Sequence, residues 1–197
     1  MKNERTALVV TSIAHPTECM RRLAEGARER ALPFYCVGDV PSPSSFKLAG
    51  CEFLSIEVQC ELSFHYAGVA PERHYARKNI GYLVAISNGA QWVLETDDDN
   101  SPLDGFWGMA HADDYKNVEG SGWYNVYEWF GADAWPRGFP LEHVLSANEG
   151  FHVHDTQTVR PLVWQGLVSG EPDVDAIYRL TRQNSPQFVA NTPLVLG

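Results

Sequence analysis

Three consecutive carboxylates, Asp97, Asp98 and Asp99, directly follow the strand-like run at residues 91–96, with no Gly or Pro between them. In an extended segment the side chains at positions i and i+2 point to the same face, so Asp97 and Asp99 can share one divalent cation. A short acidic run is usually a surface turn, but its place directly after a buried-looking strand favours a metal site. Mn²⁺ or Mg²⁺ held by two carboxylates keeps open positions for phosphate oxygens. We therefore expect a nucleoside diphosphate as the ligand.

A local excess of positive charge precedes this acidic run. Arg77 and Lys78 lie near the start of a helical pattern over residues 75–88, in a protein whose net charge is −10. We expect them to neutralise the diphosphate, and Gly81 to let the nucleotide approach the helix backbone closely. The alternative is a solvated helix face on which these cations pair with Glu72.

Further polar or loop residues follow the other strand-like runs. Thr11, Ser12 and Ile13 come at the end of the first run, and Asp39 follows the second. Each is a candidate to bind the base or ribose of the nucleotide, and each is equally suited to be a local cap or turn former.

Two motifs in the second half add candidates. Arg137 lies in the turn-like sequence at residues 135–138, where a substrate contact is the functional interpretation and an ordinary rigid turn the alternative. His152 and His154 alternate as in a strand, a spacing compatible with a metal or substrate contact, but no third ligand is identifiable nearby.

These residues need a scaffold that brings them together. The first half alternates strand-like and helix-like stretches in the manner of a parallel α/β sheet, whose ligands lie at the carboxyl ends of the strands. The expected strands are 7–13, 33–39, 51–56 and 91–96, and the expected helices begin near residues 16, 75 and 172. The sequence therefore predicts a Rossmann-type α/β fold with a mostly parallel central sheet, followed by an aromatic-rich loop region over residues 106–140.

Length and composition restrict the function classes. With 197 residues we expect one domain, truncated at its C-terminal end because the chain stops in the strand-like stretch at 194–197. The charge of −10 argues against nucleic-acid binding, and no apolar run approaches the length of a membrane span. No leader-like segment opens the chain, so we expect a cytoplasmic protein.

The four cysteines are Cys19, Cys36, Cys51 and Cys60. They form no CxxC pair, and the first three are expected to be small core residues.

Four segments carry a resemblance to a known family. The stretches at residues 77–83, 95–99, 135–138 and 173–180, in this order, resemble the glycosyltransferase-like domain of the STELLO proteins and their bacterial relatives, within the GT-A class of nucleotide-sugar glycosyltransferases. The acidic run is also similar to that of the reversibly glycosylated polypeptides, which act as UDP-arabinopyranose mutases. STELLO proteins are longer and membrane-anchored, and this sequence shows no anchor.

The resemblance implies a GT-A-like fold, a DXD motif with Mn²⁺ or Mg²⁺ at Asp97 and Asp99, and a nucleotide sugar that also contacts Asp98. It implies a hexosyl- or pentosyltransferase that moves a sugar from a UDP-sugar to a hydroxyl acceptor, in glycan or cell-surface polysaccharide synthesis. The alternatives are a non-catalytic sugar-nucleotide-binding or scaffolding module, and a nucleotide-sugar mutase.

An inverting transfer needs a carboxylate to take the acceptor's proton, and the candidates are Asp173 and Asp175. Acids at a helix start are also favoured by the helix dipole. Because residues i and i+2 cannot share a helical face, we expect at most one of them to face the substrate while the other caps the helix or meets solvent. Asp173, next to the turn at residues 170–172, is the preferred base.

Overall fold

Strand β1 (Thr6–Thr11) is the central strand of the first half, and both of its faces are buried. Ala7 and Val9 pack into one hydrophobic cluster, whereas Leu8 and Val10 pack into another on the opposite face. This alternation explains the continuous apolar run, since a strand covered on both sides has no face to leave polar.

The computed structural model describes residues 5–108, 113–182 and 185–196. The opening residues, from which the absence of a leader was argued, lie outside the described part.

Four parallel strands form the first sheet, in the order β3-β2-β1-β4. The remaining strands are β2 (Phe34–Val37), β3 (Glu52–Leu54) and β4 (Trp92–Glu95). All four were expected from the sequence, each somewhat longer than the structure shows. The α/β fold with a mostly parallel central sheet is thereby confirmed.

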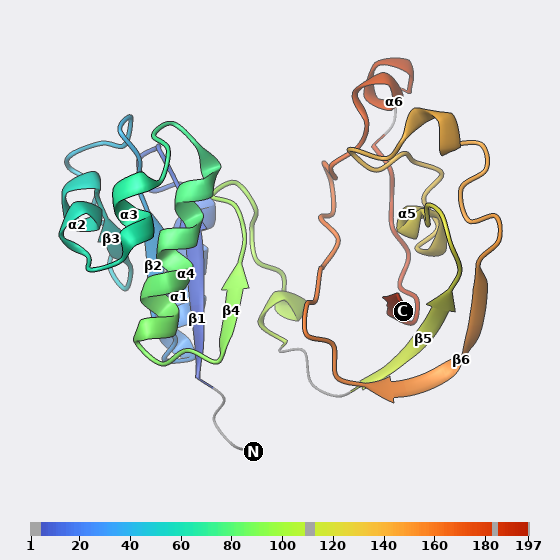
Figure 1. Ribbon diagram of the computed structural model, residues 1–197, viewed down its shortest axis with the longest axis horizontal. Coiled ribbons are helices and arrows are strands. Elements are labelled where there is room, and N and C mark those ends of the chain that lie inside the picture. Colours follow the sequence, from blue (N-terminus) through green and yellow to red (C-terminus); the bar gives the residue numbers. More distant parts are fainter. Residues whose placement is uncertain (1–4, 109–112, 183–184, 197) are drawn as a thin grey trace. The chain divides into compact units, whose positions relative to one another are not determined.

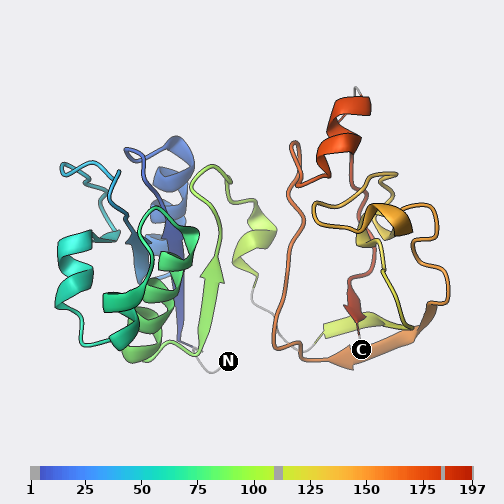
Figure 2. The ribbon, with the colours of Figure 1, turned by 45° about the horizontal axis from the view of Figure 1, so that its top comes forward.

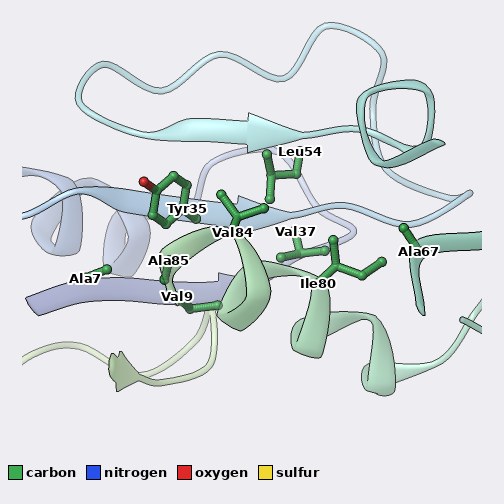
Figure 3. Close-up of a cluster of buried hydrophobic side chains, with 9 residues drawn as sticks. All are labelled: Ala7, Val9, Tyr35, Val37, Leu54, Ala67, Ile80, Val84 and Ala85. Atoms are coloured by element: carbon green, nitrogen blue, oxygen red, sulfur yellow. The ribbon is translucent and has the colours of Figure 1, made fainter. Parts of the chain in front are cut away.

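Two long helices cover opposite faces of this sheet. Helix α4 (Lys78–Ser87) packs through Ile80 and Val84 on the face of Ala7 and Val9, and Figure 1 shows it in front of β1 and β2. Figure 3 shows this cluster at close range. Helix α1 (Glu18–Glu29) packs on the other face. Its N-cap is Thr17, whose side chain accepts a hydrogen bond from the Met20 amide, so Pro16 precedes the cap and is not in the first turn.

Short elements complete the first half. The 3₁₀ helix η1 (Tyr75–Arg77) leads directly into α4, which ends at Ser87; Asn88 is its C-cap, and Gly89 follows with φ 85°. Such a left-handed residue after a helix is a common stop, as the sequence predicted. The sequence did not predict two other short helices, α2 (Ile56–Glu61) and α3 (His65–Val69). The 3₁₀ helix η2 (Asp104–Trp107) ends this half.

The chain forms two compact units, residues 1–107 and 108–197, which we describe separately. That the whole chain acts as one domain stays a prediction. In the second unit the sheet order is β6-β5-β7, with β5 antiparallel to β6 and parallel to β7 (Figure 2). The elements are β5 (Asp113–Glu119), α5 (Val126–Trp129), η3 (Leu141–His143), β6 (His152–Val159), α6 (Ala176–Thr181) and β7 (Leu194–Leu196).

The stretch at residues 106–140 was expected to be an aromatic-rich loop region, but it contains β5 and α5, and it is partly ordered by packing of its own. Tyr127, Ala134 and Tyr178 form a small buried cluster, and the Tyr127 hydroxyl donates to the Asp173 carbonyl oxygen at 2.9 Å. Burial, together with the charge of Asp173, raises the pKa of Tyr127, so this phenol stays a donor at neutral pH.

Two further findings concern cysteines and membranes. All four cysteines are free thiols; Cys36 is buried, Cys60 is exposed, and Cys19 and Cys51 are half-buried. Of the three predicted core cysteines, Cys36 alone is fully buried. Across the described residues, none of the helices combines the length and the apolar character needed to cross a bilayer.

Candidate functional site

The three carboxylates after β4 separate into two kinds. Asp98 is half-buried and accepts a hydrogen bond from Ser12 Oγ at 2.5 Å, while Thr17 Oγ1 donates to the Asp98 carbonyl oxygen at 2.7 Å. Asp97 and Asp99 are exposed. The loop is therefore anchored through its middle residue. It is a turn, in which the Asn100 amide donates to the Asp97 carbonyl oxygen at 3.4 Å, and not the extended segment for which a shared face of Asp97 and Asp99 was expected. The resemblance gave Asp98 a nucleotide-sugar contact, and the structure shows it bonded to the β1–α1 loop.

This loop lies where the strand order of the sheet reverses. The chain runs outward from β1 to β2 and β3, then returns to place β4 on the other side of β1, and β1 and β4 are parallel (Figure 2). Parallel sheets bind ligands at the carboxyl ends of the strands at such a switch point. The Ser12–Asp98 bond joins the two strand ends on either side of it.

Lys78 contacts the acidic loop directly. Its Nζ lies 3.0 Å from Asp97 Oδ1 and 3.8 Å from Glu95 Oε2, and it donates to the Thr96 carbonyl oxygen at 3.3 Å. The Lys78 side chain is 15% exposed, whereas that of Asp97 is 66% exposed. The structure thus places a cation beside the acidic loop, and the contact of Lys78 with a diphosphate stays a prediction.

Arg77, the neighbouring cation, is directed elsewhere, and its prediction as a diphosphate ligand needs correction. Arg77 is 4% exposed, and its Nε and Nη2 donate to Gln59 Oε1 at 2.9 and 2.7 Å. Its Nη1 donates to the Ala70 carbonyl oxygen at 2.9 Å. A third acceptor is the Pro71 carbonyl oxygen, 3.4 Å from Nη1. Because the guanidinium is buried and bonded to these three protein acceptors, it cannot reach a ligand without breaking this network.

Gly81 also has a role other than the predicted one. A Cβ at this position would lie 2.6 Å from Val9 Cγ1 and 2.7 Å from Val37 Cγ2, two residues drawn in Figure 3. Real Cβ atoms are not found so close to other side chains, so the glycine is needed for α4 to approach the sheet. The close approach is between helix and strand, and not between helix and nucleotide.

Asp39 is used as a turn former, one of the two interpretations left open by the sequence. Its Oδ1 accepts from the Val40 amide at 2.7 Å and its Oδ2 from the His74 amide at 3.0 Å. Burial alone would raise the pKa of Asp39, but hydrogen bonds from backbone amides, including that of Arg73, together with the Arg77 charge, lower it overall. Asp39 therefore fixes the segment that leads into η1.

The remaining first-unit candidates lie at the end of β1. Ser12 is 4% exposed, Thr11 is half-buried and Ile13 is 58% exposed. Sequence reasoning missed Gln59 and Ser42. Gln59 is fully buried and accepts hydrogen bonds from the Arg77 guanidinium, and no pattern in the sequence indicates this role. Ser42 lies in a Pro/Ser-rich loop, and its Oγ donates to the Ser12 carbonyl oxygen at 2.9 Å.

The second unit brings its own candidates together. Arg137 Nη2 lies 2.6 Å from Asp173 Oδ1, and the Arg137 amide donates to the Asp173 carbonyl oxygen at 3.0 Å. Asp175 Oδ1 accepts from the Ile177 amide at 2.7 Å and caps α6. This agrees with the expectation that one of the two acids is a cap. His154 Nε2 lies 3.3 Å from Glu119 Oε2 on an exposed strand.

The chemistry of the acidic loop suits a hard divalent cation. Two exposed carboxylates separated by one anchored residue supply oxygen ligands and leave positions for substrate oxygens. Among the described residues there is no ready-made group of three or more His, Cys, Asp or Glu side chains placed to hold a metal ion.

Comparison with known proteins agrees with the resemblance in the sequence. No family model matches the chain. It is 29% identical to the probable glycosyltransferase STELLO2 and 28% identical to the probable glycosyltransferase STELLO1, both of Arabidopsis thaliana. Each match covers 90% of this chain and 25% of the plant protein, so the chain spans about a quarter of the length of these relatives. The predicted similarity to the STELLO proteins is confirmed.

Proposed function

We propose that this chain is the nucleotide-sugar-binding part of a metal-dependent glycosyltransferase that acts on a UDP-linked hexose or pentose and a hydroxyl acceptor. One observation carries the proposal: at the switch point of a parallel sheet, Ser12 holds Asp98 while Asp97 and Asp99 stay exposed. The names of the plant relatives support the reaction class.

The residues of the first unit would bind the leaving group. When bound at Asp97 and Asp99, Mn²⁺ or Mg²⁺ would act as a Lewis acid toward the diphosphate. Lys78, whose Nζ already lies at this loop, would add a second positive charge where negative charge develops. Ser12 and Thr17 would keep the loop in place during binding through their bonds to Asp98.

The transfer itself exchanges one bond for another. The acceptor oxygen bonds to the anomeric carbon, the bond from that carbon to the phosphate oxygen breaks, and the electron pair leaves with the diphosphate. In an inverting reaction a carboxylate takes the hydroxyl proton; the candidate from the sequence is Asp173, which belongs to the second unit. The Asp173 side chain is 66% exposed, and its Oδ1 lies 2.6 Å from Arg137 Nη2.

The decisive experiment measures binding of UDP with and without Mn²⁺ by thermal shift and calorimetry. A ligand that binds only the folded protein raises its apparent stability. We expect UDP to stabilise the parent only with Mn²⁺, and the Asp97→Asn/Asp99→Asn variant to lose this effect. The matched control is Asp104→Asn, an exposed acid of the same unit. Undiminished metal-dependent binding by the double variant contradicts the proposed site.

A non-catalytic sugar-nucleotide-binding module is the second candidate. It is favoured by the engagement of both proposed bases, Asp173 in an ion pair and Asp175 in a helix cap. Release of free sugar from UDP-sugars distinguishes the two functions. An enzyme hydrolyses the donor slowly in the absence of acceptor and loses this activity in Asp173→Asn while still binding UDP. A binding module holds UDP and Mn²⁺ but releases no sugar.

A further inference from the structure

An open groove of about 510 Å³ lies between α1 and the loop at residues 45–49. On the helix side Arg21, Ala24 and Arg28 line it, and these positions fall on one face of α1 because they are three and seven residues apart. On the loop side it is lined by Lys47 and Leu48. None of these residues belongs to the acidic loop described above.

The rim of the groove is basic in an acidic protein. The residues that line the groove include three cations and one acid: the cations are Arg21, Arg28 and Lys47, and the acid is Glu25. His15 also lines the groove. Arg28 and Glu25 are 4.0 Å apart with side chains 68% and 64% exposed, a pairing too loose and too hydrated to neutralise the rim. The protein carries a net charge of −10, so this local reversal of sign selects for an anionic ligand.

One of the cations is held in place before any ligand arrives. Arg21 Nη1 donates to the Pro16 carbonyl oxygen at 2.7 Å, which uses one of the five guanidinium donors and fixes the direction of the rest. Pro16 is itself part of the groove wall. A guanidinium oriented in this way is suited to a carboxylate or phosphate group, since both present paired oxygens to its fork.

The floor of the groove is apolar. Ala24 and Leu48 contribute to it; Ala24 belongs to the hydrophobic cluster beneath α1, and Leu48 packs against that cluster. The volume lies within the range of sites for small molecules and exceeds what a bare phosphate ion fills. A ligand with an apolar ring face and an attached anionic group matches both the floor and the rim.

We propose that this groove binds an anionic saccharide, with its carboxylate or phosphate group against Arg21, Arg28 and Lys47 and its sugar ring over the apolar floor. The anionic group of the ligand is argued from the groove alone, whereas its saccharide nature rests on the proposed function. That the saccharide serves as the hydroxyl acceptor rests on the proposed function.

The test measures binding of four probes to the whole chain by calorimetry and by NMR: glucuronate, glucose 1-phosphate, glucose and inorganic phosphate. We expect at least one of the two anionic sugars to bind ten times more tightly than glucose, and more weakly as salt is added. The two sugars also show whether carboxylate or phosphate is preferred. Equal binding of glucose and both anionic sugars, or inorganic phosphate binding as tightly as the better sugar, overturns the proposal.

The location is tested with Arg28→Ala/Lys47→Ala, which we expect to lose tenfold or more in affinity for the anionic sugar. The matched control is Arg22→Ala, because Arg22 is an exposed arginine of α1 that is not among the groove residues. Equal losses in both variants, or no loss in either, contradict the assignment.

A further variant separates this proposal from the proposed function. Asp97→Asn/Asp99→Asn should bind the anionic sugar normally, while Arg28→Ala/Lys47→Ala should keep Mn²⁺-dependent UDP binding. If the Asp97/Asp99 variant alone loses the sugar, the probe binds at the acidic loop and the groove proposal fails. If UDP binds neither the parent nor any variant, the proposed function fails. The sugar-binding measurements would still decide the groove proposal.

Discussion

Lys78 Nζ and Asp97 Oδ1 form an ion pair of 3.0 Å between the first turn of α4 and the loop that follows β4. Lys78 is largely covered and Asp97 largely exposed, so the pair lies at the boundary of the protein and the solvent. A cation that binds Asp97 must share the carboxylate with this ammonium group. The same ammonium group would face a phosphate bound at this loop.

The first prediction concerns Lys78→Met, which removes the charge and keeps much of the side-chain volume. Loss of a charge-assisted contact to phosphate costs about 1.5–3 kcal/mol, so UDP affinity in Mn²⁺ should fall about tenfold or more. Binding of Mn²⁺ alone should not weaken, because a competing cation has been removed from Asp97. Calorimetry with each ligand separately checks both statements. Unchanged UDP affinity would remove Lys78 from the site.

The second prediction concerns Arg77→Met, which should reduce stability and not affinity. It leaves Gln59 Oε1 and the Ala70 carbonyl oxygen without their buried donor, and each orphaned group costs about 1–3 kcal/mol. Urea unfolding should show a large loss of stability, whereas Lys78→Met should unfold like the parent. UDP affinity of folded Arg77→Met should remain near that of the parent. A stable variant with weakened UDP binding would restore Arg77 as a ligand.

The third prediction is a pH dependence that arises from Asp39. Its pKa is below the ordinary value of 3.8, so the charged form is stabilised by folding. This contribution is present above the unfolded-state pKa and is lost as the pH falls through the folded-state pKa. Asp39→Asn should therefore be less stable than the parent at pH 7, by about 1–3 kcal/mol, and the gap should narrow toward pH 3. A gap that is constant between pH 7 and pH 3, measured against Asp104→Asn as control, contradicts this origin.

The fourth prediction separates the two acids of the second unit. Asp175→Ala removes the cap of α6 and should cost about 0.5–2 kcal/mol of stability, while Asp175→Ser, which retains a capping oxygen, should recover most of it. Asp173→Asn weakens only an exposed ion pair and should change stability by less than about 1 kcal/mol. Thermal melts of the three variants provide the measurement. Equal destabilisation by Asp173→Asn and Asp175→Ala would contradict the division of roles.

The sequence predicted what depends on local pattern. The four strands of the first sheet follow from continuous apolar runs, and the end of α4 follows from Asn88 and Gly89, because these signals lie within a few neighbouring residues. Helices α2 and α3 were missed because their six and five residues are too few to show a 3.6-residue period.

The site was harder to predict, because the partners of its residues are distant in the sequence. Nothing near Arg77 indicates that a buried Gln59 will accept from its guanidinium. Likewise, Gly81 has the same appearance in the sequence whether a nucleotide or Val9 lies against it. Lys78 and Arg77 are adjacent and chemically alike, yet the turn from η1 into α4 directs one toward the acidic loop and the other into the interior.

The bond between Ser12 and Asp98 joins residues 86 positions apart in the chain, and this separation has a kinetic consequence. Contacts of such long range form slowly, since the intervening chain must first be ordered. During refolding, therefore, competence to bind UDP should return with the slowest phase of sheet formation and not with early helix formation. A ligand held across the two strand ends should in turn slow the separation of β4 from β1, so that bound nucleotide prolongs the lifetime of the folded first unit.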